Sequence, residues 1–286
     1  MPELPEVEIT KRIFSKHLKN TKVTKVDLFK KNLRWEVCEK IKTLFTNSIL
    51  LEPYRLGKFI IVPTNTKISL IIHLGMTGYL KINYKKQPLE KHDHIKLTMI
   101  NKNNEKIFLL FNDTRRFGFI DYCDENSLNK HFLIKNLGVE PLTEELNKVY
   151  LYEKLKQKSI SVKVALLDQR IIAGIGNIYA SEILFLSRLH PLFNVKYINK
   201  DLAEKLCSSV KIILLKAIKK GGTTIQDFRN PEGKLGYFNQ KLSVYSREGK
   251  RCVICASIIK KILLSGRSSF FCEKCQSIST KFLKEL

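Results

Sequence analysis

The first eighteen residues place apolar side chains at the spacing of a helix. Leu4, Val7, Phe14 and Leu18 fall on one face when the chain is wound at about 3.6 residues per turn. Pro5 and the acidic residues beside it suit a first helical turn, where proline is tolerated and carboxylates face the positive end of the helix dipole. The pattern predicts an amphipathic helix at the N-terminus.

Short apolar or alternating segments follow, separated by turn residues, as is typical of β-strands. They predict strands at residues 23–28, 59–62, 69–74, 94–100, 106–111 and 117–123, with a turn at 55–59. Strands at this spacing favour a β-sandwich or barrel, and we expect the first helix to pack beside it.

The pattern changes at residues 125–145, where asparagine, glycine and proline accumulate. Beyond this point the spacing predicts helices at 150–157, 162–169, 177–186 and 200–219, the last ended by Gly221 and Gly222. Residues 223–240 are loop-like, and 242–245 with the cysteine-rich segment are expected to form small hairpins. The predicted divisions are 1–135, a linker at 136–145, a helical region at 146–240 and a terminal region at 241–286.

Charge points to a polyanionic partner. The 286 residues contain 51 Lys and Arg against 27 Asp and Glu, a net charge of +24, and such a field favours nucleic acid. Lysine is abundant throughout, so positioned arginines are more informative. Apolar runs stay below the roughly 18 residues of a membrane helix, and the N-terminus lacks the pattern of a signal peptide. We therefore expect a cytoplasmic protein, with an anionic membrane surface as a lesser alternative partner.

Four of the seven cysteines form two Cys-x2-Cys pairs, Cys252 with Cys255 and Cys272 with Cys275, separated by 16 residues. Without a secretory signal, this spacing indicates metal ligation rather than disulfides. Four thiolates complete a tetrahedral zinc site and leave no position for water, so one structural Zn²⁺ is predicted. Arg267 lies between the pairs, at the expected tip of a hairpin, where it can meet a phosphate.

The N-terminus carries candidate chemistry. Initiator methionine is commonly removed before a small residue, which would expose the secondary amine of Pro2. An α-amino group has a pKa near ~7.7–8, so part of it is free at neutral pH and can attack a sugar carbon or a carbonyl. Glu3 and Glu6 stand close behind it in sequence and could move protons. The same residues also make an ordinary helix start.

Two loops combine features suited to DNA. Residues 112–118 contain Arg115, Arg116 and Phe117, and a phenylalanine beside arginines can wedge into a base stack while the cations hold the backbone. Met76 occupies a second loop tip. Packing beneath a loop is the alternative for both.

Gly174 and Gly176 precede a predicted helix, whose free N–H groups can bind phosphate. The motif lacks the third glycine and the preceding strand of a dinucleotide fingerprint, and it also fits a tight turn between helices. The spacing of His73, His92 and His94 specifies no metal site.

Several motifs together resemble bacterial formamidopyrimidine-DNA glycosylase, from end to end and in the family's order. They are Pro2–Glu8, His73–Gly78, Asn112–Gly118, Gly176–Glu182, Gly236–Phe238 and the cysteine pairs. The resemblance implies an α+β protein with an N-terminal β-sandwich flanked by a helix, a helix–two-turns–helix domain and a C-terminal β-hairpin zinc finger. It also implies a bifunctional glycosylase and lyase of base excision repair. Its partner would be double-stranded DNA with oxidised bases, bound by a monomer in a basic cleft, with the damaged purine flipped out.

The resemblance assigns roles to individual residues. Pro2 would be the nucleophile toward C1′, Glu3 the acid and base, Glu6 a supporting group and Lys58 a lysine near the damaged nucleotide. Met76, Arg115 and Phe117 would fill the gap left by the flipped base, and residues 221–238 would cover that base. The remaining DNA contacts would be His73, Lys163, Asn177 and Arg267, and the zinc ligands Cys252, Cys255, Cys272 and Cys275. The iminium formed at Pro2 would permit β- and δ-elimination.

Two alternatives remain open at this stage. One is the related endonuclease VIII-like glycosylase for oxidised pyrimidines, which typically has glycine at the position of Leu4. The other is a non-catalytic, zinc-bearing DNA-binding protein, which leaves Pro2 and Glu3 without a role. Thr114 departs from the family, which often has proline there, and this puts the rigidity of its loop in doubt.

Overall fold

A computed structural model describes residues 2–223 and 242–277. The described residues form two compact units that do not follow sequence order. The first falls within Met1–Lys135 and Lys220–Asn239, and the second within Asn136–Lys219 and Gln240–Leu286. Residues 220–223 therefore pack with the N-terminal unit, although the sequence groups them with the helical region.

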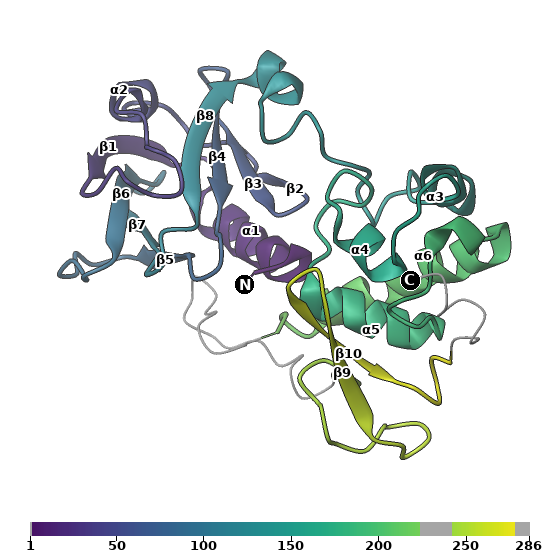
Figure 1. Ribbon diagram of the computed structural model, residues 1–286. Coiled ribbons are helices and arrows are strands. Elements are labelled where there is room, and N and C mark those ends of the chain that lie inside the picture. The colour runs from purple at the N-terminus through teal and green to yellow at the C-terminus, as the bar shows by residue number, and fades with distance from the viewer. Residues whose placement is uncertain (1, 224–241, 278–286) are drawn as a thin grey trace. The chain divides into compact units, whose positions relative to one another are not determined.

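The first unit contains two antiparallel sheets of four strands in its described residues (Figure 1). One has the order β1-β6-β7-β5, with bounds Lys22–Leu28, Asp93–Ile100, Lys106–Asn112 and Tyr79–Asn83. The other has the order β2-β3-β4-β8, with bounds Tyr54–Leu56, Phe59–Pro63, Ile68–His73 and Phe119–Asp124. The predicted strands are observed, and β2 and β5 are additional.

One hydrophobic core joins the two sheets and makes the unit a β-sandwich. Inward-facing side chains of both sheets share it with Val7, Phe14 and Leu18 of α1 (Leu4–Leu18). The predicted apolar face of the first helix is thus the buried one, and α1 packs beside β2 and β3 (Figure 1). A short helix α2 (Lys40–Phe45), which the sequence did not predict, packs on β1, and the 3-10 helix η1 (Glu125–Lys130) follows β8.

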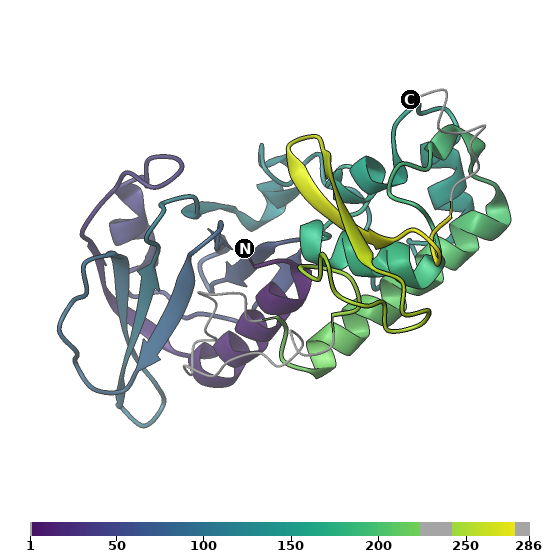
Figure 2. The same ribbon diagram turned by 60° about the horizontal axis from the view of Figure 1, so that its bottom comes forward.

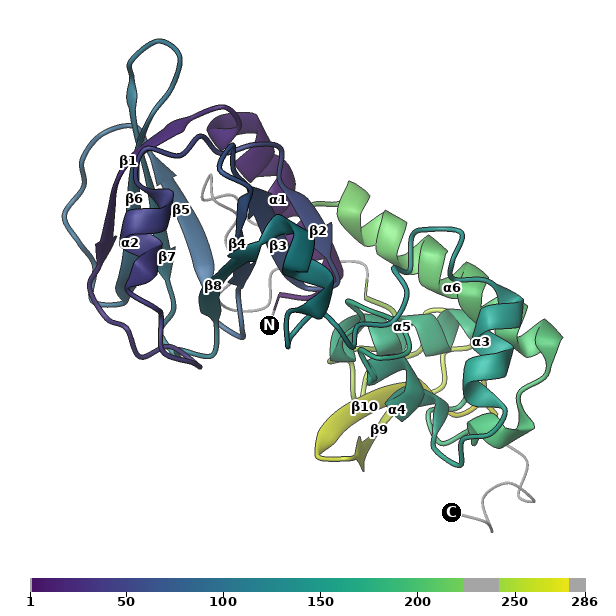
Figure 3. The same cartoon turned by 90° about the horizontal axis from the view of Figure 1, so that it is seen from above.

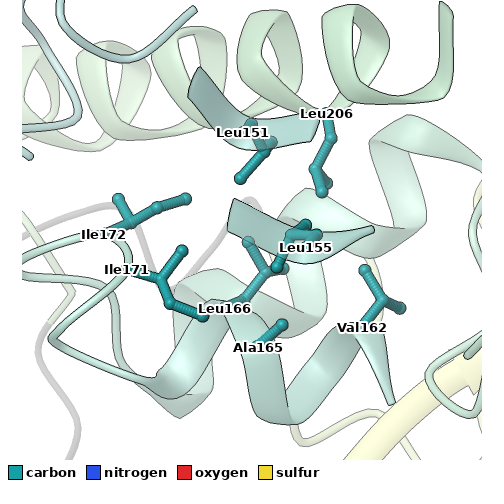
Figure 4. A pocket seen from close by; sticks show the side chains of 8 residues that line it. All are labelled: Leu151, Leu155, Val162, Ala165, Leu166, Ile171, Ile172 and Leu206. Carbon is teal, nitrogen blue, oxygen red and sulfur yellow. The ribbon is translucent and has the colours of Figure 1, made fainter. Parts of the chain in front are cut away.

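The second unit is built from helices around an aliphatic core. Its helices are α3 (Lys148–Leu155), α4 (Val162–Leu167), α5 (Asn177–Ser187) and α6 (Lys200–Lys219), with the 3-10 helix η2 (Val195–Tyr197) before α6. In Figure 3, α3 lies along α6, and α6 also packs against α5. The small gap between α3, α4 and α6 is lined only by aliphatic side chains, namely Leu151, Leu155, Val162, Ala165, Leu166, Ile171, Ile172 and Leu206 (Figure 4). Without a polar group, this gap belongs to the core rather than to a binding site.

A β-hairpin lies at the end of the described part of the second unit. Strands β9 (Ile259–Leu264) and β10 (Arg267–Cys272) pair antiparallel, and β10 packs beside α5 (Figure 2). The predicted hairpin at 242–245 is wrong, because this segment is a turn. Its N–H groups at Ser243, Val244 and Tyr245 donate to the buried carboxylate of Glu182 at 2.8–2.9 Å. These backbone N–H groups therefore bind a side chain of α5 instead of pairing with another strand.

None of the helices within 2–223 and 242–277 has the length and apolar character needed to cross a membrane.

Candidate active site and metal centre

The residues around Pro2 form the start of α1. Pro2 is buried, Glu3 is the residue before the helix, and Glu3 and Glu6 form a capping box. Oε2 of Glu6 accepts a hydrogen bond from the backbone N–H of Glu3 at 2.9 Å. Both glutamates are almost fully buried. The helix start that the sequence predicts is therefore also the scaffold that orients the peptide carrying Pro2.

A second segment completes the surroundings of Glu6. Thr223 donates to Glu6 Oε1 from its backbone N–H at 2.7 Å and from its hydroxyl at 3.0 Å. Gly222 has a positive φ of 76°, and a Cβ at this position would lie 2.8 Å from Glu6 Oε1. Glycine is thus needed for the approach of the segment as well as for its conformation. The sequence analysis placed Gly221 and Gly222 at the end of α6 and at the start of the segment expected to cover the flipped base, and it did not predict the contact with Glu6.

Lys58 lies in a turn of the second sheet, and His73 lies on a strand of the same sheet. Lys58 lies in the β2–β3 turn after Gly57, whose φ is 55°, and Phe59 pairs with His73 in the β3–β4 register. The imidazole of His73 stacks on Phe119, with ring centroids 5.3 Å apart and planes at 12°. Its Nδ1 accepts the Gly75 N–H at 3.1 Å. Burial lowers the pKa of His73 to about 3, and the charges of Lys58 and Arg34 add to the effect.

His73 is therefore expected to be neutral at neutral pH and to remain neutral well below pH 6.5. Its pKa in the folded state lies below the ordinary value near ~6.5, so the unfolded chain binds more protons between these values. The contribution of neutral His73 to the free energy of unfolding is therefore fully present above pH 6.5. It decreases as the pH falls, by about 2 kcal/mol between pH 7 and 5. Replacing His73 with glutamine should remove this part of the pH dependence. The measurement is the imidazole ¹⁵N shifts and urea unfolding at both pH values; titration of His73 near pH 6.5 would contradict the expectation.

Two loop tips carry the predicted wedge residues, and one buried carboxylate holds both. Asp113 accepts hydrogen bonds from the hydroxyl of Thr77 at 2.5 Å and from the backbone N–H groups of Arg115 and Gly118 at 3.3 and 2.7 Å. The Thr77 hydroxyl also accepts from the Arg115 N–H at 3.0 Å. Asp113 is fully buried. Neither Asp113 nor Thr77 was predicted as a site residue, although they lie within the motifs Asn112–Gly118 and His73–Gly78.

This arrangement brings Met76, Arg115 and Phe117 together as exposed side chains. The guanidinium of Arg115 lies 4.8 Å over the Phe117 ring. Gly75 has a φ of 63°, and a Cβ there would lie 2.3 Å from the Gly118 nitrogen, so only glycine lets the loops touch. Thr114 is exposed, and the bonds to Asp113 fix the loop without a proline at that position.

The second unit brings the three predicted phosphate ligands into one neighbourhood. Lys163 is buried, and its Nζ donates to the hydroxyl of Ser181 at 2.7 Å. Asn177, the first residue of α5, donates from Nδ2 to the backbone oxygen of Ser268 at 2.9 Å, next to the exposed Arg267. Among the described residues, Asn177 Oδ1 is buried without a hydrogen-bond partner. The helix start and the β10 strand are thereby tied together beside two cations.

The four cysteines satisfy the requirements of a zinc site. The four Sγ atoms lie within 4.8 Å of one another, and two of the pairs are 3.4 and 3.8 Å apart. Zinc–sulfur bonds of about 2.3 Å in a tetrahedron place sulfurs about 3.8 Å apart. All four thiols are free of disulfides. Cys252, Cys255, Cys272 and Cys275 can therefore bind one zinc ion, as predicted.

Replacing Cys272 with serine is expected to release the zinc and to weaken DNA binding. Cys272 is fully buried at the end of β10, and a serine hydroxyl is a poor zinc ligand in place of a thiolate. Metal analysis after dialysis should find less than about a tenth of the wild-type zinc. Cys38→Ser, at an exposed cysteine outside the cluster, should keep one zinc per chain. Unchanged zinc in the Cys272 variant would refute its assignment as a ligand.

The segment expected to cover a flipped base, residues 221–238 with the motif Gly236–Phe238, lies outside the described residues from position 224 onward.

Family models match three parts of the chain in sequence order. They are the formamidopyrimidine-DNA glycosylase N-terminal domain at residues 1–120, its H2TH domain at 137–229 and a zinc finger found in FPG and IleRS at 249–278. The formamidopyrimidine-DNA glycosylases of Rickettsia conorii and Histophilus somni are 42% and 43% identical over 276 residues. Each alignment covers 96% of this chain and 99% of the relative.

Solved structures of Lactococcus lactis Fpg agree with the sequence matches. A complex with DNA containing an abasic site has a TM-score of 0.88 at 31% identity, covering 96% of this chain and all of that chain. A complex with DNA containing N7-benzyl-Fapy-dG has a TM-score of 0.89 at 32% identity, covering 97% and all of the respective chains. On its sequence and its fold, this chain belongs to the formamidopyrimidine-DNA glycosylase family.

Proposed function

We propose that this DNA glycosylase of base excision repair removes oxidised purines from double-stranded DNA and then cleaves the strand, with the N-terminal amine of Pro2 as its nucleophile. The observation that carries the proposal is the buried start of α1, where Glu6 holds the Glu3 peptide and Pro2 is enclosed. Membership of a family of glycosylases with lyase activity supplies the reaction class.

The proposed chemistry follows from a secondary amine with a carboxyl group beside it. The Pro2 nitrogen donates its lone pair to C1′, the bond from C1′ to the base breaks, and the proton that the Pro2 nitrogen loses goes to the departing base. Glu3 then delivers a proton to the ring oxygen, so that the sugar opens and an iminium forms. The iminium acidifies C2′–H, and loss of that proton expels the 3′-phosphate. A second elimination removes the 5′-phosphate.

The two loop tips are proposed to hold the DNA open. Met76, Arg115 and Phe117 are exposed on loops that Asp113 makes rigid, and apolar wedges beside cations stabilise an unstacked step. We assign Lys58 and His73 to contacts near the damaged nucleotide, His73 acting as a neutral donor through Nε2. This tautomer follows from Nδ1 accepting the Gly75 N–H.

The second unit is proposed to bind the phosphate backbone. Lys163, Asn177 and Arg267 provide two cations, an amide and the start of α5, which together suit a phosphate. The zinc ion holds the hairpin that bears Arg267 and takes no part in the chemistry. In this division, residues 1–135 carry catalysis, whereas 146–240 and 241–286 bind DNA across a linker at 136–145.

The substrates proposed are 8-oxoguanine and ring-opened formamidopyrimidines. Relatives are named for the formamidopyrimidine activity, and solved complexes of the Lactococcus lactis protein contain Fapy-dG DNA. One complex of that protein contains an oxidised pyrimidine, so pyrimidine lesions form the comparison in the test. We further propose that the enzyme acts as a monomer in the cytoplasm, where chromosomal DNA of bacteria lies.

The test is incubation of the mature protein with duplexes that contain 8-oxoguanine opposite cytosine, in the presence of borohydride. A covalent protein–DNA adduct and cleavage on both sides of the lesion are expected. A duplex with an oxidised pyrimidine serves as the competing substrate, and undamaged DNA as the blank. DNA binding without adduct or cleavage would leave only a DNA-binding protein and would overturn the proposal.

Phe117→Ala is expected to slow excision about tenfold or more, because the wedge that compensates for the lost base stacking is gone. Phe117 is 41% exposed and contributes little to the core, so zinc content and thermal unfolding should not change. Single-turnover excision of 8-oxoguanine gives the rate. Wild-type excision in this variant would contradict the wedge role.

A further inference from the structure

One exposed aromatic surface remains outside the roles assigned above. It consists of Trp35, Phe132 and Arg34, here called the Trp35 platform. Trp35 is the only tryptophan of the chain and is 40% exposed, and Phe132 is 52% exposed. Large aromatic side chains that are held rigidly yet left open to solvent are typical of binding surfaces.

The platform is held in place by ring contacts. The Trp35 ring meets Phe119 edge to face, with centroids 5.1 Å apart at 85°, and meets Phe132 at 5.9 Å and 83°. The guanidinium of Arg34 lies 4.8 Å over the indole. Such an arrangement fixes the indole and presents a stacked cation with it, so a ligand would meet a preorganised surface.

The platform is continuous with the loop that bears Phe117. The backbone N–H of Arg34 donates a hydrogen bond to the backbone oxygen of Gly118 at 3.2 Å, and Gly118 directly follows Phe117. Phe119, which supports Trp35, also stacks on His73. A chain of direct contacts therefore connects Trp35 to the proposed wedge and to the proposed lesion contacts.

Charge near the platform favours an anionic ligand. Arg34 and Lys58 are both close enough to His73 to lower its pKa, and Arg115 lies over Phe117. The ring of Phe132 contacts that of His131, with centroids 4.8 Å apart, and His131 is in turn paired with Asp121 at 3.1 Å. An arginine stacked on tryptophan can bind a phosphate with its N–H groups while the ring contacts a base or a sugar.

We propose that the Trp35 platform binds a nucleotide of the DNA duplex, with Arg34 on its phosphate and Trp35 against its base or sugar. The platform extends the DNA-binding surface beyond the loop tips of Met76 and Phe117. It rests on the proposed function, because it requires a DNA substrate.

The single tryptophan makes the proposal directly measurable. The full-length, zinc-loaded protein is titrated with a duplex that contains a tetrahydrofuran abasic-site analogue, and binding is followed by the anisotropy of a label on the DNA. Saturation should reduce the acrylamide quenching of Trp35 fluorescence at least about twofold, because the DNA shields the indole. Trp35→Ala should weaken DNA binding about fivefold or more, which is the smallest loss expected when one base–aromatic stack is removed. Trp35→Phe keeps an aromatic ring and should recover most of the lost affinity.

The matched control is a substitution at an exposed aromatic residue outside the platform. Tyr84 is an aromatic residue that is 52% exposed and contacts His17 rather than the platform, and Tyr84→Ala should bind like the wild type. Duplex binding with unchanged quenching of Trp35, or with wild-type affinity in Trp35→Ala, would overturn the platform and leave the proposed function standing. Failure of the wild-type protein to bind the duplex at all would overturn both.

Discussion

A chain with one extra glycine ahead of Pro2 is expected to form no borohydride-trapped adduct with damaged DNA. The extension converts the Pro2 nitrogen into an amide, which has no free lone pair for attack on C1′. It also moves the terminal amine by one residue, about 3.8 Å, from the position that the start of α1 fixes. Because well-oriented reactants have effective molarities of about 10⁵ M or more, we expect trapping to fall at least about a thousandfold.

The comparison requires two chains of defined N-terminus, one that begins at Pro2 and one that begins with the added glycine, each checked by intact mass. Pro2→Gly is a second variant, which leaves a primary amine on a residue with a freer backbone, and we expect it to lose the adduct too. Zinc content and binding to an abasic-site analogue should be unchanged in both. Equal trapping by the extended chain would show that another group, such as a lysine, is the nucleophile.

Local sequence patterns were sufficient for most of the elements and for the zinc site. The apolar spacing of Leu4, Val7, Phe14 and Leu18 predicted α1 and its buried face, because that spacing matches the geometry of a helix. The cysteine pairs predicted the zinc ligands, because four thiolates at that spacing leave few other uses. Short elements such as α2 and β5 lack the length that gives a pattern its signal, and tertiary packing determines them.

The groups that hold the candidate site together could not be read from the sequence, because their partners are distant along the chain. Thr223 reaches Glu6 across 217 positions, and Glu182 captures a turn 61 to 63 residues away. Asp113 joins two loops separated by 36 residues through Thr77. Each is a buried polar group whose identity reflects a need for hydrogen bonds, and that need appears only when the fold brings donors to it.

Glu6→Gln is expected to have the second-largest effect, although it changes a single atom of a buried side chain. Within the described part of the chain, the wild-type carboxylate accepts a hydrogen bond from the Glu3 N–H on Oε2 and two from Thr223 on Oε1. An amide has only one oxygen. Whichever way it turns, its NH₂ group faces a backbone N–H that cannot accept, either that of Glu3 or that of Thr223. A buried donor left without an acceptor costs about 1–3 kcal/mol, and this strain acts on the peptide that carries Pro2.

We therefore expect the trapping rate of Glu6→Gln to fall about a hundredfold, since a displacement of about 1 Å can have such an effect on a reaction between positioned groups. Thr223→Val removes only the hydroxyl donor and keeps the N–H, so its loss should be smaller, about tenfold. Glu52→Gln changes an exposed glutamate that pairs with Lys19 and should be silent. Thermal unfolding separates the two effects: a lower midpoint with a wild-type trapping rate would make Glu6 a purely structural group. A hundredfold slower trapping with near-normal DNA binding would instead identify it as the residue that positions the nucleophile.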